Sequence, residues 1–291
     1  MFPLESVPNF SEGRDRETID ALGAALAGGG ARLLDVHADA DHNRSVFTLV
    51  GDDAALVAGL VAGVACARER IDLRRHEGVH PRVGAADIVP LVAIRPEDLE
   101  RAGAAATEAA GRIGELGLPV FLYGEPGRGP AFFRRGGPEE LQRRIDGGEF
   151  APDFGPAKLD PSAGAVLVGA RRPLIAFNVN LRNGDVEVAR SIAAVVRESG
   201  GGFPGVRALG LDLPRSGLVQ VSMNVEDWEA AALSGIVARI AAEAEARGAE
   251  VAGSELVGLM PAGAAAEAAG AALRIDGFDA TRVLELRLLE D

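Results

Sequence analysis

The stretch VRALGLDLPRSGLVQVSMNV, residues 206–225, decides the fold. It contains two runs with the composition of β-strands, Val206 to Leu213 and Leu218 to Val225, and no helix separates them. Consecutive strands without a helix between them form an antiparallel pair, which does not suit the parallel sheet of a Rossmann fold. The sequence therefore predicts an α+β protein.

The elements on either side of this pair complete a familiar order. A strand from Leu174 to Leu181 and a helix from Asp185 to Glu198 precede it. A helix from Glu226 to Arg247 and a strand from Glu250 to Leu256 follow it. The resulting order, β-α-β-β-α-β, is that of a ferredoxin-like sandwich.

The first half repeats this order with different residues. We expect strands at 4–7, 32–36, 45–50, 87–94 and 119–123, helices at 15–26, 53–70 and 96–116, and a loop at 124–164 with one short helix at 138–145. After the second repeat, a last helix is expected near 263–272 and a last strand near 283–288. Two ferredoxin-like subdomains, residues 1–178 and 179–291, are expected to flank a ligand-binding cleft.

Composition excludes several classes of protein. Of the 291 residues, 47% are hydrophobic and 25% charged, an ordinary globular balance. The net charge of −13 argues against a general nucleic-acid binder and against attraction to anionic membranes. The single cysteine, Cys66, excludes an internal disulfide framework. No signal peptide and no transmembrane run is recognised, so a cytoplasmic protein is expected.

All four histidines lie between residues 37 and 80, namely His37, His42, His76 and His80. The segment His76-Glu77-Gly78-Val79-His80 fits the H-E-x-x-H pattern, which binds zinc when a helix places both imidazoles on one face. Gly78 and the following Pro81 disfavour such a helix. We therefore expect a protein that binds no metal at this segment, and a zinc hydrolase remains the alternative. The spacing from His37 to His42, with Asp39 and Asp41, fits either a metal site or a polar turn.

The other interpretation is an active-site loop from Arg74 to Gly84. An unperturbed histidine titrates near pH ~6.5, so it can accept and return protons at neutral pH. Arg74, Arg75 and Arg82 flank the two histidines of this loop. In an acidic chain, a local arginine cluster indicates recognition of an anion, although the same arginines could simply offset neighbouring carboxylates.

Seven blocks follow one another along nearly the whole chain: VPNFSEG (7–13), LDV (34–36) with NRS (43–45), HEGVHPRVGAAD (76–87), LYGE (122–125), APDFGP (151–156), GAR (169–171) with LIAFNVNL (174–181), and GSELVGL (253–259). In these blocks the chain resembles the glutamate formiminotransferase family. The resemblance implies two ferredoxin-like subdomains around a folate cleft, usually in a homodimer. It also implies transfer of a formimino group from N-formimino-L-glutamate to N5 of tetrahydrofolate, which yields 5-formiminotetrahydrofolate and L-glutamate in histidine breakdown.

The resemblance also assigns residues. The family's catalytic histidine falls on His80. Its folate-contacting stretch falls on ten consecutive residues: Gly155, Pro156, Ala157, Lys158, Leu159, Asp160, Pro161, Ser162, Ala163 and Gly164. Tetrahydrofolate is then a co-substrate, and the expected partners are small molecules and a second copy of the chain. His37 stands where animal members carry an aspartate, so Asp39 or Asp41 is the candidate for that acidic position.

These residue types suit the chemistry. A neutral imidazole can remove the proton from N5 as it attacks and can then protonate the departing glutamate nitrogen. Arginines such as Arg44 and Arg82 are available for the carboxylates of formiminoglutamate and of the folate tail. A formyl donor or formiminoglycine is an open alternative for the substrate. A non-catalytic folate-binding protein is the remaining alternative to an enzyme.

Overall fold

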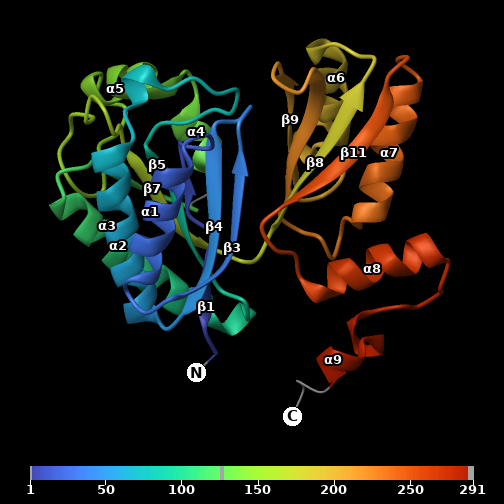
Figure 1. Cartoon of the computed structure of the whole chain (residues 1–291), viewed down its shortest axis with the longest axis horizontal. Coiled ribbons are helices and arrows are strands. Elements are labelled where there is room, and N and C mark those ends of the chain that lie inside the picture. The colour runs from blue at the N-terminus through green and yellow to red at the C-terminus, as the bar shows by residue number, and fades with distance from the viewer. Residues whose placement is uncertain (1, 125–127, 288–291) are drawn as a thin grey trace. The chain divides into compact units, whose positions relative to one another are not determined.

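The structure is a computed structural model that describes residues 2–124 and 128–287 (Figure 1). Glu125 of the LYGE block and Leu288 of the expected last strand lie outside these residues. The chain divides into two compact units, Met1–Arg172 and Pro173–Asp291. A division after residue 178 would cut strand β8 (Ile175–Arg182), so the expected boundary moves to the residues before that strand.

One sheet forms the centre of unit 1. Its strands are β1 (Leu4–Ser6), β2 (Asn9–Phe10), β3 (Arg32–Asp39), β4 (Arg44–Gly51), β5 (Ala86–Val92), β6 (Val120–Tyr123) and β7 (Val166–Arg171). Both β1 and β2 lie between β4 and β5, so the spatial order is β3, β4, β1 with β2, β5, β7, β6. Pairing is antiparallel from β3 to β5, whereas β7 pairs in parallel with β5 and β6.

Three long helices cover one face of this sheet, α1 (Arg16–Ala27), α2 (Asp53–Arg70) and α3 (Leu99–Glu115) (Figure 1). Asp15 and Asp52 cap the first two by accepting backbone N–H groups. Helices α1 and α2 approach so closely that a Cβ on Gly59 would lie 2.2 Å from the Leu26 carbonyl oxygen. The helix expected from Pro96 begins at Leu99, after a 3₁₀ turn.

The segment between β6 and β7 is more helical than expected. It contains α4 (Pro130–Arg134) and α5 (Gly137–Asp146), of which only the second was expected. Phe133 is fully buried there, with its ring centroid 5.1 Å from that of Phe121 on β6. Buried aromatic packing of this kind fixes a short helix that has little stability of its own.

Unit 2 contains β8 (Ile175–Arg182), α6 (Val186–Val196), β9 (Val206–Leu213), β10 (Leu218–Val225), α7 (Leu233–Glu245) and β11 (Glu250–Val257). The antiparallel β9–β10 pair is confirmed, with Val206 opposite Val225. The spatial order is β11, β8, β10, β9, all antiparallel. The two sheets with their helices confirm the α+β class.

The C-terminal part of unit 2 differs from the expectation. Helix α8 (Ala262–Leu273) is present, but Leu284–Arg287, expected to form a strand, is the short helix α9. Alternating Leu, Glu, Leu and Arg favours a strand locally, yet a strand also needs a sheet edge to pair with. Within the described part of the chain, no helix combines the length and apolar composition needed to cross a bilayer.

Candidate active site

The loop between the 3₁₀ turn Leu73–Arg75 and β5 carries His76, His80 and Arg82. The segment 155–164 holds both ends of this loop. The Leu73 N–H donates to the Ser162 carbonyl at 2.8 Å, and the Ala85 N–H donates to the Ala163 carbonyl at 2.8 Å. The structure thus places the histidine loop beside the segment that was predicted to contact folate.

Close backbone contacts shape the segment 155–164. Gly164 has φ +69°, and a Cβ there would lie 2.1 Å from the Val83 carbonyl oxygen. The Asp160 carboxylate accepts the N–H groups of Ser162 and Ala163, both at 2.9 Å. Leu159, Ala163 and Gly164 are buried, Asp160 and Ser162 are half-buried, and the exposed residues are Gly155, Pro156, Ala157, Lys158 and Pro161. The segment therefore ends in a turn that the hydrogen bonds of Asp160 hold in place, and the exposed residues 155–158 precede this turn in the sequence.

The turn between β3 and β4 is the second support of the loop. Asp39 shapes the turn, because its Oδ1 accepts the His42 N–H at 2.6 Å. Asn43 has φ +46°, and its side-chain nitrogen donates to the Glu77 carbonyl at 3.0 Å. The Val79 N–H donates to the Asp41 carbonyl at 3.2 Å. The turn and the histidine loop are thus hydrogen-bonded to each other.

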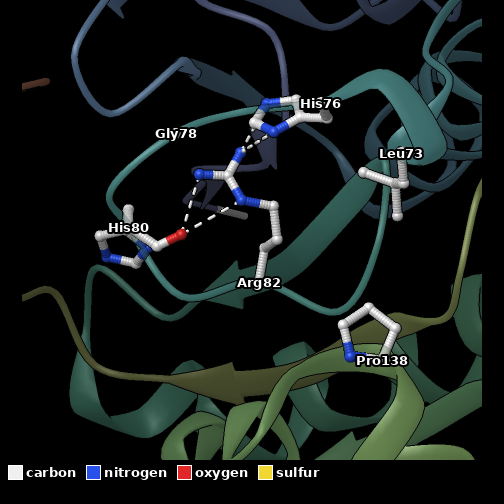
Figure 2. Close-up of a pocket in the computed structure, with 6 residues that line it drawn as sticks. All are labelled: Leu73, His76, Gly78, His80, Arg82 and Pro138. Atoms are coloured by element: carbon white, nitrogen blue, oxygen red, sulfur yellow. Dashed lines mark hydrogen bonds between the residues drawn. The ribbon is translucent and has the colours of Figure 1, made fainter.

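Arg82 joins the loop and the turn through its guanidinium. It donates to the carbonyl oxygens of His42 at 2.8 Å, Asn43 at 3.1 Å and His80 at 2.8 Å. Its Nη1 also lies 3.1 Å from Nδ1 of His76 (Figure 2). Burial lowers the pKa of Arg82 to about 10, and it stays charged at neutral pH. These contacts make Arg82 a support of the loop as well as a positive charge.

A cavity of about 290 Å³ lies beside this arginine. Its lining residues come from the loop and from the start of α5: Leu73, His76, Gly78, His80, Arg82 and Pro138 (Figure 2). Its volume is near the lower end of the ~300–1,000 Å³ typical of small-molecule sites. The cavity can hold part of a substrate, and the imidazoles of two histidines border it.

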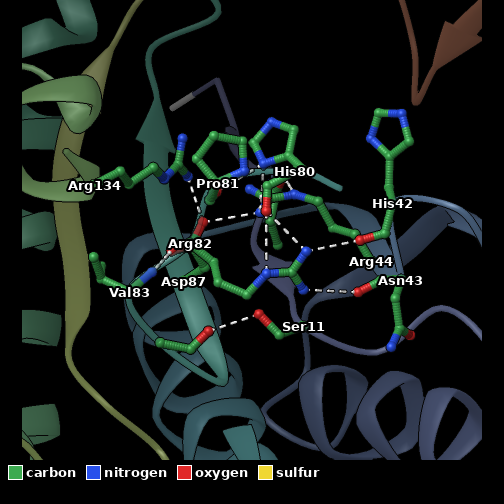
Figure 3. Close-up of polar contacts among 12 residues, drawn as sticks. Ser11, His42, Asn43, Arg44, His80, Pro81, Arg82, Val83, Asp87 and Arg134 are labelled. Carbon is green, nitrogen blue, oxygen red and sulfur yellow. Dashed lines mark hydrogen bonds and ion pairs between the residues drawn. The ribbon is translucent and has the colours of Figure 1, made fainter. Parts of the chain in front are cut away.

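The polar contacts around His80 include a buried carboxylate, that of Asp87 (Figure 3). Asp87 on β5 is fully buried, and its Oδ2 accepts Nη1 of Arg44 at 2.9 Å and Nη2 of Arg134 at 2.5 Å. Its Oδ1 accepts the Val83 N–H at 2.8 Å. Arg44 on β4 also donates Nε to the Asn9 side chain at 2.9 Å. Two guanidiniums from distant parts of the chain thus share one carboxylate.

Charge and burial act in opposite directions on this cluster. Burial alone would raise the pKa of Asp87, but Arg134, Arg44 and the Val83 N–H outweigh it and hold that pKa below its ordinary value. Burial lowers the pKa of Arg44 to about 10, against the opposing effect of Asp87. Asp87 is therefore a carboxylate and both arginines are cations at neutral pH, so the cluster carries one net positive charge.

Backbone geometry selects the tautomer of His80. Its Nδ1 lies 2.8 Å from the Pro81 carbonyl oxygen, which can only accept. The proton of a neutral His80 is therefore assigned to Nδ1, which leaves the Nε2 lone pair available as a base. Nη1 of Arg44 lies 3.4 Å from the same Nδ1 and donates to Asp87 instead.

The surroundings of His80 keep it neutral. Burial lowers its pKa well below the ordinary value, and the nearby charges of Arg44 and Arg134 lower it further. Asp87 opposes them, and His42, whose ring stacks on His80 with centroids 5.8 Å apart, adds a small lowering effect. His80 is thus unprotonated at neutral pH, as a general base must be.

The structure bears on the sequence expectations for the H-E-x-x-H segment, for His37 and for Arg44. The residues 76–80 form no helix, and among the described residues no group of three or more His, Cys, Asp or Glu side chains could hold a metal. His37 lies on β3 opposite Val46, in the β3–β4 ladder. Arg44, expected as a substrate contact, is buried and ion-paired.

Sequence reasoning missed two residues of the site. Asp87 ends the HEGVHPRVGAAD block, but nothing in the block tells which charges it meets. Arg134 lies in a stretch expected to be mostly loop, 47 residues from Asp87. Only the folded chain joins them, so no local pattern could have found Arg134.

Fold and site together define a class of protein. It is a two-unit α+β protein with a neutral histidine, positively charged surroundings and a braced turn beside them. Such a site suits proton transfer on an anionic small molecule.

Comparison with known proteins gives the family. Residues 3–171 match the formiminotransferase domain, N-terminal subdomain, and residues 176–276 match the formiminotransferase domain. The glutamate formimidoyltransferase of Streptococcus pyogenes serotype M1 is 41% identical over 98% of both chains. That of Thermoplasma acidophilum is 37% identical over 99% of this chain and 98% of its own. The formimidoyltransferase-cyclodeaminase of Rattus norvegicus is 40% identical over 91% of this chain, which spans 51% of that protein. The chain belongs to the formiminotransferase family.

Proposed function

We infer that the chain transfers the formimino group of N-formimino-L-glutamate to N5 of tetrahydrofolate. The products are 5-formiminotetrahydrofolate and L-glutamate, and tetrahydrofolate is a co-substrate. The observation that carries this inference is the similarity to two glutamate formimidoyltransferases along 98% of their length. The function is therefore that of a folate-dependent one-carbon transferase in histidine degradation.

His80 is the proposed general base. N5 of tetrahydrofolate attacks the formimino carbon and becomes cationic as the new bond forms. Nε2 of His80 takes that proton, and the imidazolium then gives it to the glutamate nitrogen as the carbon–nitrogen bond to glutamate breaks. The Nδ1 contact with Pro81 and the lowered pKa of His80 support this proposal.

The segment 155–164 is the proposed folate contact. Its exposed residues, from Gly155 to Lys158, are available to a flat ligand, and the turn at Asp160 braces them. Asp39 is proposed to act through the turn that it shapes. Arg44 and Arg82 are proposed to attract the substrate carboxylates by charge, because their guanidiniums donate hydrogen bonds to protein groups.

Each unit is proposed to be a ferredoxin-like sandwich. In both, the fourth strand of the β-α-β-β-α-β order pairs with the first, the first with the third and the third with the second. A folate cleft, a homodimer and a cytoplasmic location stay predictions.

The decisive experiment is an assay with N-formimino-L-glutamate and tetrahydrofolate, run with and without a chelator. We expect 5-formiminotetrahydrofolate and glutamate in equal amounts, at a rate that the chelator does not change. Glutamate released without tetrahydrofolate, and lost on chelation until zinc is restored, would instead favour the zinc hydrolase. Binding of folinate without turnover of any formimino or formyl donor would favour a binding protein.

A further inference from the structure

Arg134 joins the charged cluster beside His80 through its ion pair with Asp87, although it lies 47 residues from that carboxylate in the chain. It is the last residue of α4, and its side chain is 14% exposed. The preceding Phe133 is fully buried against Phe121, which anchors that end of the helix. The direction of Arg134 toward Asp87 is therefore set by the packing of α4.

We propose that Arg134 is a positioning residue for the formimino transfer proposed above: through the shared carboxylate of Asp87, it holds the Arg44–Asp87 pair beside His80 and supplies the positive charge that this pair alone lacks. The geometry behind this proposal is the single oxygen, Oδ2, that accepts from both guanidiniums (Figure 3). Because the two donors share one acceptor, a shift of one changes the position available to the other.

The charges that face His80 come from several elements. Arg44 on β4 and Arg134 on α4 are positive, Asp87 on β5 is negative, and His42 lies in the β3–β4 turn. On its own loop, Arg82 donates to the His80 carbonyl. Without Arg134, Arg44 and Asp87 would neutralise each other and His80 would face a neutral pair. Arg134 therefore supplies the excess positive charge that disfavours imidazolium.

This excess charge matters for both halves of the reaction. Before the attack, it keeps Nε2 unprotonated, so the base is ready at neutral pH. After the attack, it makes the imidazolium a stronger acid, which favours return of the proton to the departing glutamate nitrogen. The same proton is taken and returned, so His80 is regenerated in each cycle.

The test measures the protonation of His80 directly. Protein with ¹⁵N-labelled histidine is titrated by NMR, which is tractable because the chain has four histidines, and His80→Gln assigns the signal. In Arg134→Met we expect the midpoint of His80 to move to higher pH, and in Arg134→Lys to stay near the wild-type position. The acidic limb of the kcat profile should move with the midpoint. For each full pH unit by which the midpoint of the variant rises, its turnover at a given pH on that limb should be about tenfold lower.

A matched control separates charge from general loss of packing. Arg144 on α5 is a buried arginine with a side chain 5% exposed, paired with Glu149 at 2.8 Å and lying over the Phe132 ring at 4.2 Å. Arg144→Met should lose stability but leave the midpoint of His80 unchanged. Arg134→Gln is the second test variant, because it keeps a donor for Asp87 and removes only the charge. A folded Arg134→Gln whose His80 titrates as in the wild type overturns the proposal.

The two proposals fail in different ways. A wild-type protein that makes no 5-formiminotetrahydrofolate contradicts the proposed function, while the NMR titration needs no substrate. An active enzyme in which Arg134→Gln and Arg134→Met leave both the His80 midpoint and the kcat profile unmoved contradicts the role of Arg134 alone.

Discussion

The order β5, β1 with β2, β4, β3 in unit 1 matches β11, β8, β10, β9 in unit 2, and unit 1 adds β7 and β6, but the two units bury different polar groups. Among the described residues, unit 1 buries eleven polar or charged side chains, including Arg44, Asp87 and Arg144, whereas unit 2 buries two, Asn178 and Gln220. The two in unit 2 are neutral amides, which pair with Glu255 at 3.0 Å and Asn180 at 2.9 Å respectively.

The difference shows where the chemistry lies. The four-stranded sheet of unit 2 forms without buried ions among its described residues. In unit 1, one buried ion pair joins Arg44, the first residue of β4, to Asp87 near the start of β5, next to the histidine loop, while buried Arg144 on α5 pairs with Glu149, which follows that helix in the sequence. The candidate site thus lies at strand ends and a loop of unit 1, on a scaffold whose four-strand order unit 2 shares.

The largest expected effect is on turnover. His80→Ala should lower kcat by about 10²- to 10⁴-fold, the range for loss of a general base. Binding of folinate, measured by calorimetry, should fall much less, because the segment 155–164 is unchanged. His76→Ala is the matched control and should be milder. Near wild-type turnover in His80→Ala would remove the assignment and make His76 the next candidate.

The next effect is on stability. Asp87→Asn leaves the buried guanidinium of Arg44 and the half-buried one of Arg134 facing a neutral amide, and breaking a buried ion pair in this way typically costs about 3–5 kcal/mol. Urea unfolding should show this as a lower free energy of unfolding. A loss below about 1 kcal/mol would mean that water or another group replaces the carboxylate.

Replacing a buried amide of unit 2 should lower the free energy of unfolding by less than Asp87→Asn does. Gln220→Met removes the donor to the Asn180 side chain, and one unsatisfied neutral group costs about 1–3 kcal/mol. Because Asn180 is half-buried and can reach water, we expect the lower end of this range. If urea unfolding gives the same loss for Gln220→Met and Asp87→Asn, buried ions and buried amides do not differ in the way described above.

The most gradual effect is a pH dependence of stability that we assign to the histidines of unit 1. An unfolded histidine titrates near pH ~6.5, and His80 and His76 titrate lower in the fold. Below pH ~6.5 the unfolded chain therefore binds more protons, so stability is complete above that pH and falls as the pH decreases. The slope is at most about 1.4 kcal/mol per pH unit for each histidine.

Hydrogen exchange between pH 7.5 and 5.0 can check this assignment. The amides of unit 1 should lose protection on acidification, and His80→Gln should reduce that loss. Unit 2 contains no histidine, so its amides are the internal control. An equal loss in both units would assign the effect to other groups.

Much of the fold follows from local patterns. The hairpin β9–β10 was predictable because both strands and the turn between them are adjacent in the sequence. Leu284–Arg287 was not, because its alternating pattern cannot report whether a sheet edge is free. The start of α7 at Leu233, rather than at Glu226, also differs from the periodicity.

The candidate site likewise contains residues that the sequence predicts and residues that only the folded chain brings together. His80 and its loop could be found because the histidines, glycines and arginines of 74–84 are contiguous. The partners of Asp87 could not, because Arg44 and Arg134 lie 43 and 47 residues away. Arg82 was expected to face a substrate, but its donors meet three backbone carbonyls that only the folded turn brings near.

The hydrogen bond between Nδ1 of His80 and the Pro81 carbonyl affects how the site can change by mutation. When a carboxylate side chain orients a histidine base, one substitution of that side chain removes the acceptor, and the imidazole can then rotate or change its tautomer. Here the acceptor belongs to the main chain and persists whatever side chains surround it. Point mutations near His80 can therefore adjust its proton affinity through charge, while the nitrogen that it presents stays the same.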